Sequence, residues 1–270
     1  MKTVKTAVQI LTMFSADTPA VTVSQAANNF GLTASAASRL LSSLATSGLI
    51  ERQPDRSYQP GPLAYRLGLL YHAQNRLADR INDGARKVVA QTGHTCWVSV
   101  LTETNSMLIS RFPGSRDQGF YVNAGNVLPA NASAGGKALL ARMSDVELRK
   151  LLTGKKLAAW TEKSKTDIDA VFADVAFTRE HGWSIIVDEL FVDRVSVGVA
   201  FSSSMESTPM ALSISIPSAS LEEIAVNIQT LTELACEVGQ TIQDPYWSHR
   251  QPSTDQPAII REVQAYMASS

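Results

Sequence analysis

The sequence predicts an α+β fold: a helical N-terminal domain of the winged helix-turn-helix type, followed by a larger α/β domain. Two observations support this prediction. Residues 22–52 show the pattern of two short helices joined by a tight turn and followed by a strand. From about residue 83 onward, helical patterns alternate with strands in which apolar and small polar side chains follow one another. At 270 residues, the chain is long enough for two such domains.

Composition and charge narrow the classes of protein to consider. A hydrophobic content of 44% and a charged content of 18% are typical of a soluble globular protein, and no apolar run reaches the roughly 18 residues that a membrane span requires. The net charge of −1 is unevenly divided. Residues 1–80 contain eight Lys and Arg against four Asp and Glu, whereas the remainder contains sixteen against twenty-one. A mildly basic N-terminal part suits a surface that meets phosphate groups.

The N-terminal residues and the two cysteines indicate a cytoplasmic protein. The chain begins with a positive charge and an apolar stretch, but Asp17 interrupts this stretch and its apolar residues recur at helical spacing. We therefore expect a helix rather than a signal peptide. Cys96 and Cys236 are far apart in the sequence and fit reduced thiols better than a disulfide framework.

The helix-turn-helix prediction depends on the residues that end and begin the two helices. Gly31 ends the first helix, because glycine readily adopts the left-handed conformation of a helix C-terminus. Thr33 begins the second helix, where its side-chain oxygen can accept a hydrogen bond from a free backbone N–H. The residues expected to face inward are Val23, Ala26, Ala27 and Phe30 in the first helix and Ala37, Leu40, Leu41 and Leu44 in the second. An ordinary helical hairpin is the alternative interpretation.

The outer face of the second helix and the segment after it supply the candidate DNA contacts. Residues 50–58 predict two short strands around a turn at Pro54–Asp55, which is the form of a wing. Arg52 and Arg56 near its tip are either placed to reach a phosphate backbone or minor groove, or are two solvated surface arginines. The predicted DNA-binding residues are Thr33, Ser35, Ser38, Arg39, Ser42, Arg52 and Arg56.

Two further helices flank this region. Residues 2–14 predict a helix that packs Val4 and Val8, together with Leu11 and Met13–Phe14, against the helix-turn-helix. After a break at residues 60–62, a single helix is predicted from about residue 63 to residue 80. This helix would join the two domains and could pair with its twin in a dimer.

These elements divide the chain into four parts. We expect the winged helix-turn-helix domain at 1–61, the linker helix at 62–80, the α/β domain at 81–247 and a C-terminal tail at 248–270. The tail is either loosely attached or contains a short amphipathic helix at Ile259–Met267.

The strands of the α/β domain carry information about a ligand. Two of them, at 195–202 and 210–216, alternate apolar residues with serine, glycine and alanine, so each has one apolar face and one small, hydroxylated face. Small residues on neighbouring strands suggest a concave face with room for a ligand. Close backbone packing and an exposed sheet of unusual composition are the alternatives.

The remaining strands of this domain are expected at about 96–101, 107–112 and 183–188, with a weaker one at Phe120–Val122. Helices are expected at about 81–92, 144–153, 167–181 and 220–243.

The segment Ser133–Gly136 precedes a helix and is a candidate anion site. A glycine-rich start of a helix leaves backbone N–H groups free and directs the positive end of the helix dipole toward a carboxylate. Gly135–Gly136–Lys137 is similar to the end of a phosphate-binding loop, but Ala138 stands where Ser or Thr would bind magnesium. We therefore do not expect nucleotide hydrolysis.

Taken together, these segments resemble the IclR-type bacterial transcription regulators over roughly residues 3–243. The resemblance rests on AANNFGLTASAASRLLSSLATSGLIER near the N-terminus and on GNVLPANASAGGKALLA, HGWSIIVDEL and ALSISIP in the larger domain. It implies a winged helix-turn-helix, a linker helix and an effector-binding domain of GAF-like α/β form. It also implies homodimers or dimers of dimers that bind a palindromic double-stranded DNA operator.

The resemblance also assigns the candidate effector site. Its residues are Asn131, Ser133, Ala134, Gly135, Ile186, Arg194, Ser196, Ser213 and Ser215. Asn131 stands where His is common in the family, and Asp193–Arg194–Val195 replaces a frequent Gly-hydrophobe-Arg run. Arg194 either clamps an effector carboxylate or pairs with Asp193 at the surface. Glu189 matches a frequent acidic position and is either part of this site or a salt-bridged carboxylate at the surface or at a hinge.

The sequence gives little support for catalysis. The four histidines lack metal-ligand spacing, no G-x-S-x-G turn is present, and we expect neither a cofactor nor a metal. The predicted function is a ligand-responsive transcription regulator that senses a small aromatic or oxo acid, controls a catabolic operon and does not associate with membranes. A small-molecule sensor or carrier whose helix-turn-helix binds another protein is the alternative, and an enzyme fused to a DNA-binding domain is a third. Repressor and activator use the same parts, so the sequence does not separate them.

Overall fold

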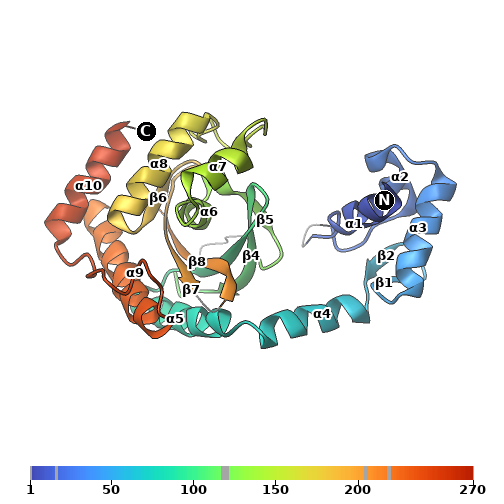
Figure 1. Cartoon of the computed structure of the whole chain (residues 1–270), viewed down its shortest axis with the longest axis horizontal. Helices are drawn as coiled ribbons and strands as arrows, with labels where there is room; N and C mark the ends of the chain where they lie inside the picture. Colours follow the sequence, from blue (N-terminus) through green and yellow to red (C-terminus); the bar gives the residue numbers. More distant parts are fainter. Residues whose placement is uncertain (1, 16–17, 117–121, 204–205, 218–219, 270) are drawn as a thin grey trace. The chain divides into compact units, whose positions relative to one another are not determined.

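The structure, a computed structural model, describes residues 2–15, 18–116, 122–203, 206–217 and 220–269 (Figure 1). The chain forms two compact units, Met1–Arg76 and Leu77–Ser270. Within the described ranges, no helix is both long and apolar enough to cross a membrane.

The first unit is a winged helix-turn-helix. Its elements are α1 (Lys2–Leu11), α2 (Val23–Phe30), α3 (Ala34–Thr46), β1 (Ile50–Arg52), β2 (Tyr58–Pro60) and α4 (Pro62–Ala73). Gly31 ends α2 with φ 60°, and the Thr33 side chain accepts a hydrogen bond from the N–H of Ala36 at the start of α3. Strands β1 and β2 pair antiparallel, and the Gln53 N–H donates to the Ser57 carbonyl at 2.8 Å across the turn. The predicted helix-turn-helix and wing are therefore confirmed.

The packing predicted for α1 is wrong in part. The helix ends at Leu11, and the side chains of Val4 and Val8 are 69% and 54% exposed. The fully buried residue is Ile10. Because Ile10 and Val8 are two positions apart, they lie on nearly opposite faces of an α-helix, so burying one exposes the other.

The single helix predicted over residues 63–80 is instead two helices. Helix α4 ends at Ala73, and α5 (Arg76–Thr92) begins after a break at Gln74–Asn75. The two helices have different surroundings. The apolar side chains of α4 include several that are exposed, whereas α5 buries Leu77, Ala78, Ile81, Ala85 and Val88 in the second unit. The helix break therefore coincides with the boundary between the two units.

The second unit is built on a six-stranded sheet with the strand order β5-β4-β3-β8-β7-β6, in which all neighbours pair antiparallel. The strands are β3 (Cys96–Thr102), β4 (Asn105–Phe112), β5 (Val127–Pro129), β6 (Ser184–Val187), β7 (Arg194–Ser203) and β8 (Glu206–Pro217). The strand β5 was not predicted from the sequence. Most of the weaker strand expected at Phe120–Val122 lies outside the described residues, and Val122 itself belongs to no strand.

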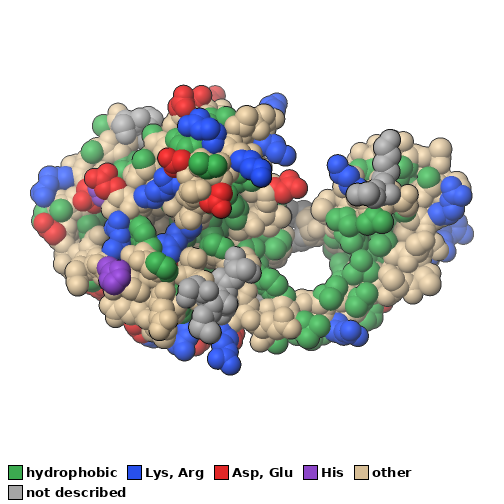
Figure 2. All heavy atoms as spheres, in the orientation of Figure 1, with side chains coloured by type: hydrophobic (Ala, Val, Ile, Leu, Met, Phe, Trp, Pro, Cys, Tyr) green, Lys and Arg blue, Asp and Glu red, His purple; other side chains and the backbone are tan. Residues whose placement is uncertain are grey.

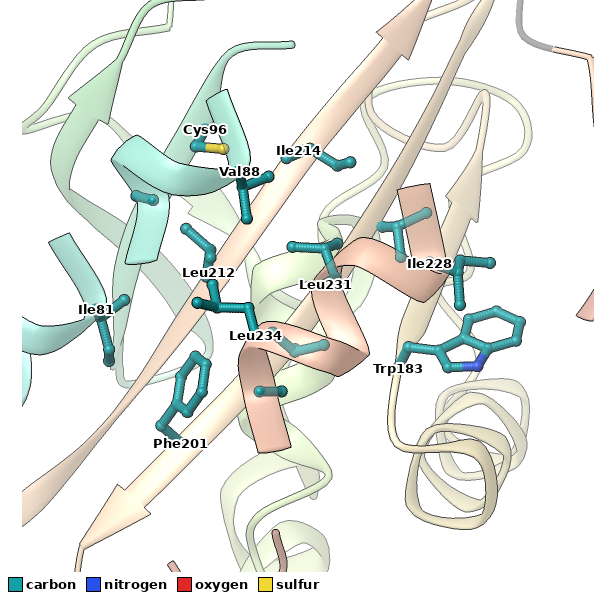
Figure 3. Packing of buried hydrophobic residues seen from close by; sticks show 14 of the residues in the cluster. Ile81, Val88, Cys96, Trp183, Phe201, Leu212, Ile214, Ile228, Leu231 and Leu234 are labelled. Carbon is teal, nitrogen blue, oxygen red and sulfur yellow. The ribbon is translucent and has the colours of Figure 1, made fainter. Parts of the chain in front are cut away.

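Helices cover both faces of this sheet (Figure 1). The helices after α5 are α6 (Ala134–Leu140), α7 (Asp145–Leu152), α8 (Ile168–His181), α9 (Leu221–Thr241) and α10 (Gln256–Ser269), and η1 (Ala130–Ala132) is a short 3-10 helix before α6. The main core lies between the sheet and α5 and α9, where Val88, Leu212 and Leu231 meet (Figure 3). The opposite face contacts α6 through β3, β7 and β8.

The C-terminal residues form an ordered helix. Of the two interpretations of the tail, the amphipathic helix is correct, and it is longer than predicted: α10 spans Gln256–Ser269. Its side chains Ile259, Val263 and Tyr266 are at most 5% exposed and belong to the main core. The connection from α9 is also anchored, because the Trp247 indole N–H donates to the Ala200 carbonyl at 2.8 Å.

Candidate functional site

A cavity lies between the sheet and the start of α6, and the roughly 400 Å³ of empty space there includes open solvent. Its lining consists of an apolar wall, a set of hydroxyl groups and the first residues of the helix. The apolar side chains are Trp97, Leu108, Val122, Leu128, Ile186 and Leu190; Ile214 also borders the cavity, but its side chain belongs to the main core. The hydroxyl groups come from Ser99, Ser106, Ser133, Ser196, Ser213 and Ser215, and the helix contributes Ala134 and Gly135.

Strand alternation explains why serines gather in the cavity. Ser196 of β7 lies opposite Ser215 of β8, and Gly198 lies opposite Ser213. Their apolar neighbours along each strand, such as Val197 and Ile214, point into the main core on the other face. The small face predicted at 195–202 and 210–216 therefore does line a cavity.

The same small face also allows close packing of α6. Ala200 and Ala211 form a buried cluster with Ala138 and Leu139 of α6. At Gly198, an added Cβ would lie 2.9 Å from the backbone carbonyl carbon and oxygen of Ala134. One part of the small face thus lines a cavity, and for the other part the close-packing interpretation is correct.

Two of the serine hydroxyls in the cavity are unusual. The oxygens of Ser99 and Ser215 are buried and have no hydrogen-bond partner among the described residues. Buried hydroxyl groups are normally satisfied by protein, water or ligand. Gly135 keeps the space beside Ser99 open, since an added Cβ would lie 2.7 Å from the Ser99 Oγ. These hydroxyls are available to a bound molecule.

The start of α6 also leaves backbone N–H groups without a side-chain cap. Ser133 occupies the N-cap position, but its hydroxyl donates to the Pro129 carbonyl at 2.8 Å and makes no capping bond. None of the fifteen described lining residues has a charged side chain. An anion in this cavity would therefore be held by neutral donors, namely backbone N–H groups and serine hydroxyls.

The cavity brings together seven of the nine predicted effector residues. These are Ser133, Ala134, Gly135, Ile186, Ser196, Ser213 and Ser215. Asn131 is not among them, because its buried amide donates to the carbonyls of Ala158 and Lys165 at 3.0 and 2.8 Å. Arg194 is also outside the lining: it is partly exposed at the start of β7, where its backbone N–H donates to Asp188 Oδ1 at 3.2 Å.

Sequence reasoning missed the part of the cavity formed by β3 and β4. Trp97 and Ser99 alternate with the core residues Cys96, Val98 and Val100, which is the same signal as in the later strands. The Trp97 indole N–H donates to the Val122 carbonyl at 3.0 Å, which fixes the ring against the cavity. The alternation in 96–101 was therefore a usable signal.

Lys137 and Glu189 have structural roles. Lys137 is fully buried, and its Nζ lies 2.6 Å from Glu189 Oε1 and 2.5 Å from Asp174 Oδ2. Burial raises the pKa of the Glu189 carboxyl, and the positive charge of Lys137 opposes this rise. Of the two interpretations of Glu189, the salt-bridged carboxylate is correct, although it is buried and not at the surface. Lys137 is likewise not available for a phosphate.

The candidate DNA contacts lie on one helix and one hairpin of the first unit. Ser35, Arg39 and Ser42 are exposed on α3, Ser38 is half-buried, and Thr33 caps the helix. Arg52 and Arg56 are exposed in the wing, and basic side chains appear on the α3 side of this unit in Figure 2. Asp55 accepts hydrogen bonds from the Ser57 hydroxyl and N–H, which lower the pKa of its carboxyl and hold the turn.

No group of three or more His, Cys, Asp or Glu side chains in the described ranges is placed to hold a metal ion. Two of the four histidines lie near carboxylates. His94 Nε2 lies 3.3 Å from Glu223, and His181 Nδ1 lies 3.2 Å from Glu262.

Comparison with known proteins identifies relatives for both units. The model of the bacterial transcriptional regulator IclR C-terminal domain matches residues 71–244, and the model of the IclR helix-turn-helix domain matches residues 3–54. The HTH-type transcriptional regulator XynR of Escherichia coli is 25% identical over 70% of this chain and 75% of its own length. The transcriptional repressor IclR of the same organism is 26% identical over 63% of each chain.

Solved structures share the fold. A putative IclR transcriptional regulator from a Silicibacter species superposes with a TM-score of 0.80 at 23% identity, covering 90% of this chain and 96% of that one. An IclR homolog from Microbacterium hydrocarbonoxydans, complexed with 4-hydroxybenzoate, gives a TM-score of 0.73 at 21% identity and covers 92% of this chain and 100% of that one.

Proposed function

Because this chain belongs to the IclR family of bacterial transcriptional regulators, we propose that its cavity binds a small organic acid and that binding controls a catabolic operon. The observation that supports this proposal is the cavity itself, whose described lining has no charged side chain and combines apolar side chains, serine hydroxyls and the start of α6. Such a mixture suits a ligand with an apolar body and one anionic end.

The lining suggests a pose for this ligand. An aromatic ring or short carbon chain would lie against Trp97 and Leu128, and its carboxylate would accept hydrogen bonds from Ser213, Ser215 and the N–H groups of Ala134 and Gly135. A buried carboxylate is tolerated only when it is well hydrogen-bonded, and bonds to an ionised acceptor are roughly twice as strong as neutral ones. The solved relative that binds 4-hydroxybenzoate favours an aromatic acid as the first candidate. Short oxo acids are the second.

The first unit would bind the operator. With α3 in the major groove, Ser35, Ser38 and Arg39 would face the bases, and Arg52 and Arg56 would contact the phosphate backbone from the wing. A dimer would place two such helices on half-sites about one helical turn apart, or a multiple of that spacing, so the operator should be a palindrome. The effector would bias the placement of the two DNA-binding units, with a coupling free energy of ~1–3 kcal/mol.

The proposed function is tested by binding of the full chain to the DNA upstream of its own gene. Binding is measured at two salt concentrations, with and without a panel of aromatic and oxo acids that includes 4-hydroxybenzoate and pyruvate. We expect specific binding that weakens steeply with salt and that one acid shifts by about 5- to 150-fold. Absence of binding to this DNA and to a wider genomic pool would contradict the regulator, and binding that no acid changes would contradict the switch.

Replacing Ser215 with alanine should weaken effector binding. Its buried hydroxyl has no partner among the described residues, so it is free to donate to a ligand carboxylate. Losing one hydrogen bond to a carboxylate costs about 1.5–3 kcal/mol, which raises the dissociation constant of the active acid roughly 10- to 150-fold in calorimetry. The matched control is Ser203→Ala, at the other end of the β7 and β8 pair and outside the cavity. Equal effects of the two substitutions, or none from Ser215→Ala, would contradict the assigned pose.

The proposed dimer would use the apolar surface of α1 and α4. The exposed apolar side chains there are Val4, Val8, Tyr65, Leu67, Leu69, Leu70 and Tyr71, and Figure 2 shows hydrophobic atoms along α4. A helix that is apolar on all sides is normally buried, so this surface favours a second copy of the chain as its partner.

Replacing Leu67 with alanine should weaken this dimer. Leu67 is 50% exposed, and loss of its burial against a partner costs about 1.5 kcal/mol, or roughly a tenfold higher dissociation constant in analytical ultracentrifugation. The control is Val146→Ala on α7, where the side chain is 79% exposed in the other unit. A dimer that is unaffected by Leu67→Ala, or no dimer in the wild type, would refute this assignment.

A further inference from the structure

A buried group of charges lies directly behind the cavity. Gly135 of α6 lines the cavity, and Lys137 is two positions further on, so the two residues point to opposite sides of the helix. Lys137 contacts Glu189, in the segment after β6, and Asp174 of α8. Lys165 contacts the other oxygen of Asp174 at 2.7 Å. Two lysines and two carboxylates thus balance one another in a site with little access to water.

The C-terminal helix contributes one polar group to this cluster. The hydroxyl of Tyr266 in α10 lies 3.3 Å from Lys137 Nζ, 3.3 Å from Lys165 Nζ and 3.3 Å from Glu189 Oε1. A tyrosine hydroxyl both donates and accepts, so it can accept from the lysines and donate to the carboxylate. Tyr266 is 5% exposed, and its ring centroid lies 5.0 Å from that of Phe177.

The cluster holds two walls of the cavity. One wall is the start of α6, which the cluster holds through the side chain of Lys137. The other is the segment after β6, where Glu189 is followed by the lining residue Leu190. The Glu189 carbonyl also accepts from the Ser164 hydroxyl at 2.6 Å, so this segment is fixed at both its side chain and its backbone. Weaker contacts within the cluster would therefore loosen both walls.

We propose that Tyr266 is a positioning residue for the effector cavity, and that α10 sets the geometry of the cavity through this hydroxyl. Helix α10 lies beyond residues 71–244, the part of the chain that the family's C-terminal domain matches. In this chain the C-terminal helix thus helps to hold the start of α6 against Glu189 from outside the matched region. The effect on a ligand rests on the proposed function, whereas the effect on the two walls does not.

The test replaces Tyr266 with phenylalanine in the full chain, which removes the hydroxyl and keeps the packed ring. Amide hydrogen exchange is followed without ligand in peptides covering 130–141 and 184–191. We expect exchange in both peptides to become about fivefold faster, with the sheet strands β3 and β8 unchanged. The matched control is Tyr246→Phe, whose hydroxyl donates to the Arg179 carbonyl at 2.8 Å and touches no member of the cluster.

Two results would overturn the proposal. One is unchanged protection of both peptides in Tyr266→Phe, and the other is a general loss of protection that Tyr246→Phe reproduces, which would mark a merely structural hydroxyl. A second measurement titrates 4-hydroxybenzoate and pyruvate, for which we expect a severalfold weaker affinity in Tyr266→Phe and an unchanged affinity in the control. If neither acid binds the wild type, the effector assignment fails, and the exchange experiment still decides the role of Tyr266.

Discussion

Replacing Lys137 with methionine is expected to lower the free energy of unfolding of the C-terminal unit by about 3–5 kcal/mol. Lys137 is fully buried, and its ammonium group neutralises Asp174 and Glu189 at distances of 2.5 and 2.6 Å. Methionine fills a similar volume, but among the described residues it leaves these carboxylates with only Lys165 as a cationic partner. The expected loss is large because a buried charge without its partner is far less favourable than a buried pair. Chemical denaturation of the wild type and the variant measures it.

The matched control is Lys163→Met. Lys163 also forms an ion pair, with Asp188 at 2.7 Å, but its side chain is 64% exposed. Exposed pairs contribute about 0–1 kcal/mol, since water screens them. If the two substitutions destabilise the protein equally, burial does not explain the contribution of the Lys137 cluster to stability.

The Lys137→Met variant should also change the pH dependence of stability. Burial already raises the pKa of Glu189, so the folded protein binds this proton more tightly than the unfolded chain does. The contribution of such a group is present at acidic pH and is lost as the pH rises through the folded pKa. Without Lys137 the pKa rises further, so the variant should be less impaired at about pH 5 than at about pH 8. If the variant loses the same unfolding free energy at both pH values, this prediction is contradicted.

The sequence was most informative where one local rule decides the structure. Gly31 and Thr33 mark helix ends that the structure reproduces, because a cap is a contact between residues three or four positions apart. The serines of β7 and β8 were also correctly placed on one face of the sheet, since strand alternation decides the face. Alternation does not say what covers that face. A cavity and a closely packed helix both require small side chains, and here each occupies part of it.

The apolar patterns predicted which side of a helix is apolar, but not which surface packs against that side. Val4 and Val8 were expected to pack on the helix-turn-helix, yet both are exposed, and α4 exposes most of its leucines. Periodicity shows that a helix has an apolar side. It does not show whether the covering surface belongs to the same chain.

Contacts between residues far apart in the sequence could not be predicted, for a different reason. Tyr266 and Lys137 are 129 positions apart, and no local pattern relates them. Ser99 is an intermediate case. Its strand alternates like the later ones, but only the antiparallel pairing of β3 with β8 places its hydroxyl in the same cavity as Ser213.

Replacing Arg39 with alanine is expected to weaken binding to the specific operator by about 1–3 kcal/mol, or roughly 5- to 150-fold. Arg39 is exposed on α3, on the face opposite the buried Ala37 and Leu41, and a guanidinium group can donate two hydrogen bonds to one guanine. Fluorescence anisotropy with operator and unrelated DNA measures the loss. The control is Arg261→Ala on α10, which removes the same charge from an exposed position in the other unit.

Salt dependence distinguishes the role of Arg39 from that of the wing. A base contact is specific, so Arg39→Ala should reduce affinity for the operator much more than for unrelated DNA. Replacing Arg52 or Arg56 with alanine should instead weaken both DNAs alike and reduce the slope of log affinity against log salt by about 0.9 for each phosphate group that the protein no longer neutralises. If Arg39→Ala behaves like Arg261→Ala, α3 does not read the bases through this side chain. If it weakens both DNAs equally, Arg39 belongs with the residues that bind phosphate, and the specificity of α3 rests on its serines.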